Sequence, residues 1–192
     1  MSETPFHLFD NWFEEAKRTE SSDPNAVTVA TVGQNGRPAA RTVLLKEWDD
    51  KGFVFYGNLG SRKAKDMNAN PYAALLFYWK SLQRQIRIEG RISLVAEAQA
   101  DAYFATRPRP SQLGAWASLQ SQPLASRAAF EARLHEVEVR FENQPVPRPA
   151  FWSGWRLSPD YFEFWQGADF RLHDRQIFRI TPHGWVSGLL YP

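Results

Sequence analysis

The sequence contains no cysteine among its 192 residues. This absence excludes disulfide bonds, thiolate nucleophiles, iron–sulfur clusters and cysteine-ligated zinc sites. Only 4 histidines are present, and no two of them stand at a helix or strand spacing that would let them share a metal ion. We therefore expect no metal site.

Long apolar runs and a large net charge are also missing. No segment approaches the roughly 20 apolar residues that cross a bilayer, and no basic stretch followed by an apolar one marks a secretory signal. The 23 basic and 21 acidic residues leave a net charge of +2, which argues against a general nucleic-acid binder. We predict a cytoplasmic protein with neither a nucleic-acid nor a membrane partner.

Aromatic residues, in contrast, are abundant. They make up 15% of the chain and include 8 tryptophans. The 43% of hydrophobic residues can build a core, and the length predicts a single domain over residues 1–192. Eight indoles exceed what a core of this size needs, so we expect some of them to cover a flat ligand or a partner subunit.

The spacing of apolar residues predicts many strands and few helices. A helix is expected in residues 1–20, where Leu8, Trp12 and Ala16 share one face, and shorter ones at 61–67, 96–106 and 126–141. Strands are expected at 26–31, 39–45, 53–56, 73–79, 83–94, 151–157, 161–165, 175–180 and 185–190. This pattern predicts a mainly β (α+β) fold that closes or half-closes into a barrel, because closure removes exposed strand edges.

Residues 41–46 (RTVLLK) carry two cations on an expected strand. Alternate side chains of a strand share a face, so Arg41 and Lys46 point to opposite faces. Lys46 stands at the end of the strand, where a pocket would open. The alternative is a pair of solvated surface cations.

Residues 58–63 (NLGSRK) form a glycine-containing loop that leads into a helix. The free N–H groups of a helix start suit an anion, and Arg62 and Lys63 add charge for a phosphate. Neither a GxGxxG nor a P-loop motif occurs, so a nucleotide site of those types is not supported. The alternative is a capped helix with surface charges.

A second phosphate site is indicated in residues 103–111. Tyr103 and Arg107 lie four positions apart on one helix face. Pro108 ends that helix, and Ser111 is expected to cap the next one. The alternative is an ordinary capped helix end.

The segment 164–175 carries Arg171, His173 and Arg175 at alternate positions. On an extended segment these three side chains would face the same side and repel one another unless an anion lay there. The alternative is a structural histidine between surface arginines.

Taken together, these segments resemble the pyridoxine/pyridoxamine 5'-phosphate oxidase family. The resemblance runs from about Leu8 to the C-terminus, in order and with the spacing of the family. It is carried by RTVLLK (41–46), YGNLGSRK (56–63), RPRPSQ (107–112), FWQG (164–167) and RLHDR (171–175).

The resemblance implies an FMN-binding split β-barrel with flanking helices. It also implies a homodimer with FMN in a cleft between the subunits, where residues 150–192 complete the site. The residues expected to hold FMN from one side are Arg41, Thr42, Val43, Leu44, Leu45, Lys46, Tyr56, Gly57, Arg62, Lys63 and Gln85. Those expected to complete the site from the other subunit are Gln120, Ser121, Trp165 and Arg175.

The resemblance also implies a reaction. Pyridoxine or pyridoxamine 5'-phosphate would be oxidised to pyridoxal 5'-phosphate by hydride transfer from C4' to flavin N5, and O2 would be reduced to H2O2. Arg171 and His173 would lie over the pyridine ring as the catalytic residues. The residues expected to take the substrate phosphate are Lys46, Tyr103, Arg107 and Ser111.

Three features depart from the family pattern. Position 57 is Gly57, where Thr or Ser is more common, and position 189 is Leu189, where Arg is usual. The chain is also expected to lack an N-terminal extension that covers the substrate in relatives. These departures leave open two other functions: a related flavoprotein that acts on another small aromatic, as in phenazine biosynthesis, and an FMN- or pyridoxal-phosphate-binding protein without turnover.

Overall fold

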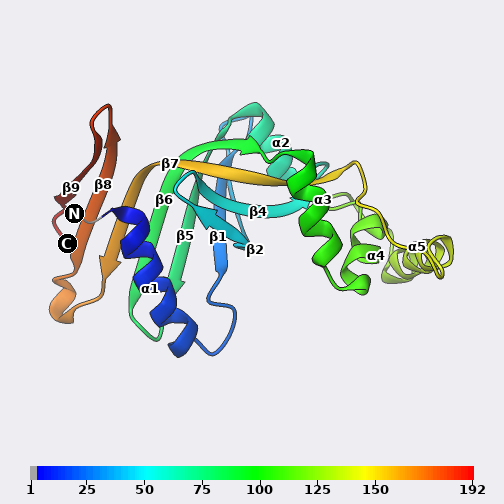
Figure 1. Ribbon diagram of the computed structural model, residues 1–192, viewed down its shortest axis with the longest axis horizontal. Helices are drawn as coiled ribbons and strands as arrows, with labels where there is room; N and C mark the ends of the chain where they lie inside the picture. The colour runs from blue at the N-terminus through cyan, green and yellow to red at the C-terminus, as the bar shows by residue number, and fades with distance from the viewer. Residues whose placement is uncertain (1–3) are drawn as a thin grey trace.

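The computed structural model describes residues 4–192 (Figure 1). Its first element is α1 (Pro5–Thr19), which confirms the expected N-terminal helix; residues 1–3 of the predicted range lie outside the described residues. The Thr4 hydroxyl accepts a hydrogen bond from the His7 N–H at 3.3 Å and caps the helix start. None of the helices within residues 4–192 is both long and apolar enough to cross a membrane.

The chain builds one antiparallel sheet in which the main path runs β2-β1-β5-β6-β7-β4-β3. The two C-terminal strands are joined to it through β7. The strands are β1 (Ala26–Val32), β2 (Pro38–Leu44), β3 (Glu47–Asp49), β4 (Gly52–Asn58), β5 (Tyr72–Trp79), β6 (Arg84–Leu94), β7 (Trp152–Gln166), β8 (Asp174–Thr181) and β9 (Gly184–Leu189). Apart from the short β3, which the sequence did not indicate, the predicted strands are confirmed in type.

The long strand β7 organises the sheet, because one of its edges pairs with β6 over residues 155–166 while its other edge is divided between two strands. Residues 152–157 pair with β4 and residues 161–166 with β8. The register with β6 shifts at Gly90, where a side chain would collide with the Ser158 carbonyl, since a Cβ would lie 2.1 Å from that oxygen. The prediction of two separate strands was therefore wrong: they are the halves of one bulged strand.

The sheet curls around an aromatic core. Lys46 N–H donates to the Val54 carbonyl at 2.9 Å as the chain passes from β2 to β3, which brings the β2 end of the path round to β4. Helix α1 covers the open side, where Phe9 and Phe13 are buried against Phe53 and Phe77 of the strands. The result is the half-closed barrel that the sequence predicted.

Four more helices flank the sheet: α2 (Arg62–Ala69), α3 (Glu97–Thr106), α4 (Arg109–Ala117) and α5 (Arg127–Arg140). In Figure 1, α3, α4 and α5 lie at one end of the molecule, and β8, β9, the start of α1 and the C-terminus lie at the other. These helices enclose a second apolar cluster against the outer face of β4 and β7. Its buried members are Phe104, Leu113, Phe141, Val146 and Trp152.

Helix α4 is the helix that Ser111 was expected to cap, but it begins earlier than expected. The helix starts at Arg109 with Pro108 in the N-cap position, so Ser111 lies inside the first turn and does not cap it. The start of α4 is held by Arg109, whose guanidinium donates to the Phe141 and Gln144 carbonyls at 2.6 and 2.8 Å. These partners are more than 30 positions away in the sequence, so local capping rules could not reveal them.

Candidate active site

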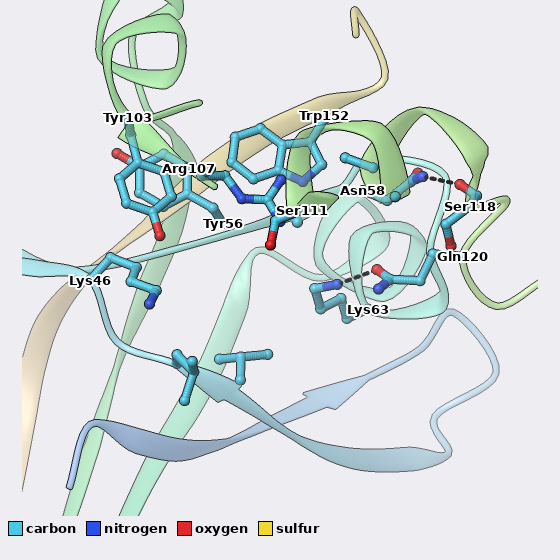
Figure 2. Close-up of a pocket in the computed structure, with 15 residues that line it drawn as sticks. Lys46, Tyr56, Asn58, Lys63, Tyr103, Arg107, Ser111, Ser118, Gln120 and Trp152 are labelled. Atoms are coloured by element: carbon cyan, nitrogen blue, oxygen red, sulfur yellow. Dashed lines mark hydrogen bonds between the residues drawn. The ribbon is translucent and has the colours of Figure 1, made fainter. Parts of the chain in front are cut away.

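A cavity of about 470 Å³ opens between strands β2 and β4 and helices α3 and α4 (Figure 2). Figure 2 shows Tyr103, Arg107 and Ser111 above it and the Lys46 and Lys63 amino groups below it. Ten of the residues singled out from the sequence line this space. They are Val43, Leu44, Lys46, Tyr56, Gly57, Lys63, Tyr103, Arg107, Ser111 and Gln120.

A second cavity of about 400 Å³ shares Val43, Lys63 and Gln120 with the first. It gathers the remaining polar residues expected to hold FMN from that side except Gln85, namely Arg41, Thr42 and Arg62, together with Ser121, which was expected from the other subunit. Leu45 was also expected to contact FMN. Its side chain is buried in the barrel core, so only its backbone is left for a ligand. The two cavities together form one cleft with a cationic end.

Lys63 is the most deeply buried cation of this cleft. Its ammonium donates to Gln120 Oε1 at 2.8 Å and to Ser61 Oγ at 3.2 Å. Burial, with a smaller contribution from Arg41, lowers the pKa of Lys63 to about 8. A buried amine with so few partners is suited to an anionic ligand, which would restore its full charge.

Gly57 makes room for this ammonium. A Cβ at position 57 would lie 2.9 Å from Lys63 Nζ, closer than real side chains approach. The space that a side chain at position 57 would take is therefore occupied by the Lys63 amine. The departure at Gly57 changes the shape of the anion site but leaves it cationic.

Arg41 is held rigidly beside Lys63. Its guanidinium donates to the Val29 carbonyl at 3.0 Å and to Thr31 Oγ1 at 2.7 Å, and it lies 3.6 Å from the Asp66 carboxylate. Burial lowers the pKa of Arg41, whereas Asp66 raises it. The hydrogen bonds use only part of the guanidinium, so the remaining N–H groups are available to a ligand.

The opposite wall is a stack of aromatic rings. Tyr56 lies over Tyr103 with ring centroids 4.0 Å apart and over Trp152 at 5.4 Å, and all three rings are nearly parallel. The Arg107 guanidinium sits 4.9 Å from the Trp152 ring. The sequence analysis missed Trp152, although the excess of indoles indicated that some would serve such a wall.

Arg107 is the one side chain of this wall with an unused buried donor. Its Nη1 is buried and finds no hydrogen-bond partner among residues 4–192. Burial lowers the pKa of Arg107, an effect that Tyr103 opposes. Leaving a charged donor unpaired in a buried place is costly, so the arrangement fits a ligand with an anionic group, such as a phosphate, at this point.

The other predicted FMN residues lie on a different part of the chain, and they include Gln85, which the resemblance had placed on the side of Arg41 and Lys63. Gln85 of β6 pairs with Trp165 of β7, which pairs with Arg175 of β8, so the three form a row across one face of the sheet. Arg175 is held by Glu163, to which its Nε donates at 2.8 Å, and by the Tyr191 carbonyl at 3.0 Å. Sequence reasoning missed Glu163, although its place two residues before Trp165 puts both on one strand face.

Glu163 is almost fully buried, at 3% exposure. Burial raises its pKa, but hydrogen bonds from Arg87 and Arg175 outweigh this effect and keep the pKa below its usual value. The carboxylate is therefore charged at neutral pH and fixes both arginines on this face.

Gln120 and Ser121 differ from the expectation for the second subunit. The resemblance assigned them to the partner's half of the site, but both line cavities beside Lys63 of their own chain. The loop after α4 carries them there, and Asn58 of β4 holds that loop by donating to the Ser118 carbonyl at 3.1 Å.

Arg171 and His173 lie outside the cleft of their own chain. The prediction that they alternate along an extended segment was wrong. Residues 169–171 form a 3₁₀ turn, and the φ angles of Phe170 and Arg171 are +55° and +66°. These left-handed residues turn the chain back between β7 and β8, so only Arg175 lies in a strand. His173 Nδ1 accepts a hydrogen bond from Ala168 N–H at 3.2 Å.

The comparisons with known proteins identify the family. The family model "Pyridoxamine 5'-phosphate oxidase" matches residues 13–141, and the model "Pyridoxine 5'-phosphate oxidase C-terminal dimerisation region" matches residues 152–192. The chain belongs to the pyridoxamine 5'-phosphate oxidase family. The fold class, the enzyme class and the FMN cofactor expected from the sequence are thereby confirmed at the level of the family.

Curated relatives in the oxidase family agree over the full chain. The chain is 58% identical to a pyridoxine/pyridoxamine 5'-phosphate oxidase of Sphingopyxis alaskensis, with 100% of this chain and 89% of that relative covered. It is 50% identical to one of Zymomonas mobilis, with both chains covered completely.

Solved structures share the same architecture. The chain is similar to PhzG from Burkholderia lata, solved in complex with tetrahydrophenazine-1-carboxylic acid, with a TM-score of 0.91 and 30% identity over 98% of this chain and 92% of that one. A pyridoxamine 5'-phosphate oxidase-related, FMN-binding protein from Nostoc punctiforme has a TM-score of 0.78 at 19% identity, covering 100% and 99% of the two chains, and supports the fold alone.

Proposed function

We propose that this oxidase-family chain oxidises pyridoxine or pyridoxamine 5'-phosphate to pyridoxal 5'-phosphate with FMN as cofactor. The observation that carries the proposal is the buried Nη1 of Arg107, which has no hydrogen-bond partner within residues 4–192 and faces the cleft beside Tyr103 and Ser111. A phosphate monoester satisfies such a donor and has further oxygens for Lys46, Tyr103 and Ser111, whereas a single carboxylate offers only two oxygens to these four groups and an uncharged aromatic leaves the donor unpaired.

The cofactor phosphate binds at the cationic end of the cleft. Arg41, Arg62 and Lys63 surround this end, and their combined charge suits a dianionic phosphate. Thr42, Gln120 and Ser121 add hydrogen-bonding groups, and the 43–46 backbone borders the flavin. When bound, FMN supplies the hydride acceptor, N5, for the hydride from C4' of the substrate, and its reoxidation by O2 yields H2O2.

The substrate phosphate binds at the other end of the same cleft. Tyr103 of α3 and Ser111 of α4 converge there with Lys46, which lies between β2 and β3, and Arg107, which follows α3. The stacked Tyr56 and Tyr103 rings lie along the cleft wall between the two phosphate sites. There they exclude water from one side of the reacting groups.

The site is completed by a second copy of the chain. Gln85, Trp165 and Arg175 lie in a row on an outer face of the sheet, and Phe170, next to Arg171, is 93% exposed. A homodimer in which this face meets the partner's cleft brings Arg171 and His173 to the substrate. There Arg171 orients the substrate and stabilises charge near C4', and His173 binds the polar substituent of the ring and takes up or releases its proton. The match of residues 152–192 to a dimerisation region supports this arrangement.

One assay tests the proposal against the two alternatives. Purified protein is mixed with FMN and pyridoxine 5'-phosphate in air, and aldehyde and peroxide are followed together. We expect both products in equal amounts. Flavin binding without turnover would favour the non-catalytic binding protein, and turnover of a phosphate-free tricyclic aromatic alone would favour the function suggested by the PhzG likeness.

Two variants test the assigned catalytic residues. Arg171→Ala and His173→Ala are expected to retain FMN and to lose most turnover, because they act on the substrate and not on the cofactor. Mixing Arg171→Ala with Arg107→Ala tests the dimer arrangement, because the two residues would come from opposite halves of a shared site. If one subunit completes the other's site, a mixed dimer holds one intact site, and activity at low substrate concentration should return after subunit exchange; no recovery would contradict a shared site.

A further inference from the structure

Glu47 forms a hydrogen-bonded link behind the wall of the cleft. It is the first residue of β3 and follows Lys46 directly. Its Oε1 accepts a hydrogen bond from the Tyr56 hydroxyl of β4 at 2.6 Å, and its Oε2 accepts one from Gln99 Nε2 of α3 at 2.7 Å. Both carboxylate oxygens are therefore used, and neither lies among the groups that line the cavity.

The hydrogen bond to Glu47 occupies the hydroxyl proton of Tyr56. Burial raises the pKa of Tyr56, and the hydrogen bond and charge of Glu47 raise it further. The phenol is therefore neutral at physiological pH and donates to Glu47. Towards a ligand in the cleft, Tyr56 can offer its ring face and an oxygen lone pair, but not its O–H.

The link also fixes the position of α3. Gln99 ties the first turns of that helix to Glu47, and Tyr103 and Arg107 follow from the same helix and its end. The Tyr103 ring packs on Tyr56 at 4.0 Å, so a shift of Tyr56 would move the phosphate-binding side chains as well. One carboxylate thus holds residues that contact the two ends of the cleft.

We infer that Glu47 is a positioning residue that holds Tyr56 and α3 together and so keeps both ends of the cleft in register for cofactor and substrate. This inference rests on the proposed function. The role that it assigns to Glu47 is in binding and not in the chemical step. The residues that Glu47 holds lie along the wall of the cleft and at its substrate-phosphate end, away from C4' of the substrate.

The test compares two substitutions in the full-length holoenzyme. Glu47→Leu removes both acceptors at similar size, whereas Glu47→Gln keeps an acceptor for Tyr56 and can meet a rotated Gln99 amide. For Glu47→Leu we expect the KM for pyridoxine 5'-phosphate to rise about tenfold, as expected for loss of hydrogen bonds to a charged group, with kcat changed less than about threefold. The FMN Kd, measured from flavin fluorescence, should rise in parallel, and Glu47→Gln should stay within about twofold of wild type on both measures.

A double-mutant cycle separates positioning from a general loss of packing. Tyr56→Phe removes the other end of the same hydrogen bond, so in the Glu47→Leu background it should add little to KM or Kd. The control is Glu97→Leu, which removes an exposed carboxylate of α3 and should change neither quantity. Thermal unfolding of each variant confirms that the comparison is made between folded proteins.

The outcomes distinguish this inference from the proposed function. Wild-type protein that neither binds FMN nor turns over pyridoxine 5'-phosphate would reject the proposed function and this inference with it. Active wild-type protein with an unchanged Glu47→Leu variant would reject the inference alone. So would full additivity with Tyr56→Phe, because the two residues would then act independently.

Discussion

Aromatic rings pack differently inside the barrel and along the cleft. Inside, the contacts are mixed: Phe9 meets Trp48 at 73° and Phe53 at 76°, edge to face, but it stacks on Phe13 at 14°. Along the cleft, Tyr103 and Trp152 lie within 15° of parallel to Tyr56. Edge-to-face contacts fill space in three dimensions, whereas a parallel stack makes a flat wall with its polar edges left free.

The rings inside the barrel contribute to stability, whereas those along the cleft contribute to ligand binding. The interior rings are enclosed by other apolar side chains and contribute chiefly through burial. The wall of the cleft carries phenol oxygens and the Arg107 guanidinium, whose buried donor has no protein partner among residues 4–192. We therefore expect substitutions inside the barrel to change stability with little effect on ligand affinity, and substitutions in the wall to do the reverse.

The largest effect should come from Phe9→Ala. Phe9 is fully buried between α1 and the strands, and loss of such a ring costs about 3–5 kcal/mol of unfolding free energy. Urea unfolding measures this cost. Below the unfolding transition the FMN Kd should equal that of wild type; a large change in Kd would show that the core and the cleft are not independent.

Arg107→Ala should give the opposite pattern. Losing a charged partner of the substrate phosphate is expected to raise the KM for pyridoxine 5'-phosphate about 100-fold. Because Arg107 already leaves one buried donor unpaired, its removal should lower stability by less than about 1 kcal/mol. Steady-state kinetics and urea unfolding test both parts. Arg107→Lys keeps the charge but loses the planar guanidinium, so its KM should lie between those of wild type and Arg107→Ala.

The affinity for FMN should depend on pH through the titration of the Lys63 ammonium. Its pKa of about 8 in the free protein means that the ammonium is charged below pH 8, and a phosphate favours that form. Affinity should be flat from pH 7 to 8, and the FMN Kd should then rise towards about tenfold per pH unit above 8. Lys63→Arg should remove the slope, and riboflavin, which lacks the phosphate, should show none. A slope that persists in Lys63→Arg would assign it to another group.

The smallest effect should come from Ser111→Ala. One neutral hydroxyl at the rim of the phosphate site is worth about 1 kcal/mol, so the KM should rise about fivefold with kcat and stability unchanged. Kinetics of this variant beside Arg107→Ala would sharpen the contrast between a charged and a neutral contact in the same wall. An effect as large as that of Arg107→Ala would contradict the proposed division of roles.

Much of the fold follows from local sequence pattern. The alternation through Ile86 and Ile88 predicts the buried face of β6, and Ser61 predicts the start of α2, where it caps the helix as expected. The bulge in β7 and the residue at which α4 begins were not predictable in this way. Both depend on partners brought together by folding, namely the Gly90 backbone for the bulge and the Phe141 carbonyl for α4.

The site shows the same division. Residue types and spacing by themselves determined that two cationic places exist, around Lys63 and around Arg107, and the family resemblance named their ligands. The single-domain organisation and the cytoplasmic location stay predictions. Only the tertiary structure decided that Gln120 meets Lys63 across 57 positions and that Glu47 meets Gln99 across 52. Spacing along a strand or helix reports neighbours a few residues apart, whereas these contacts arise when the curled sheet and its helices close on one another.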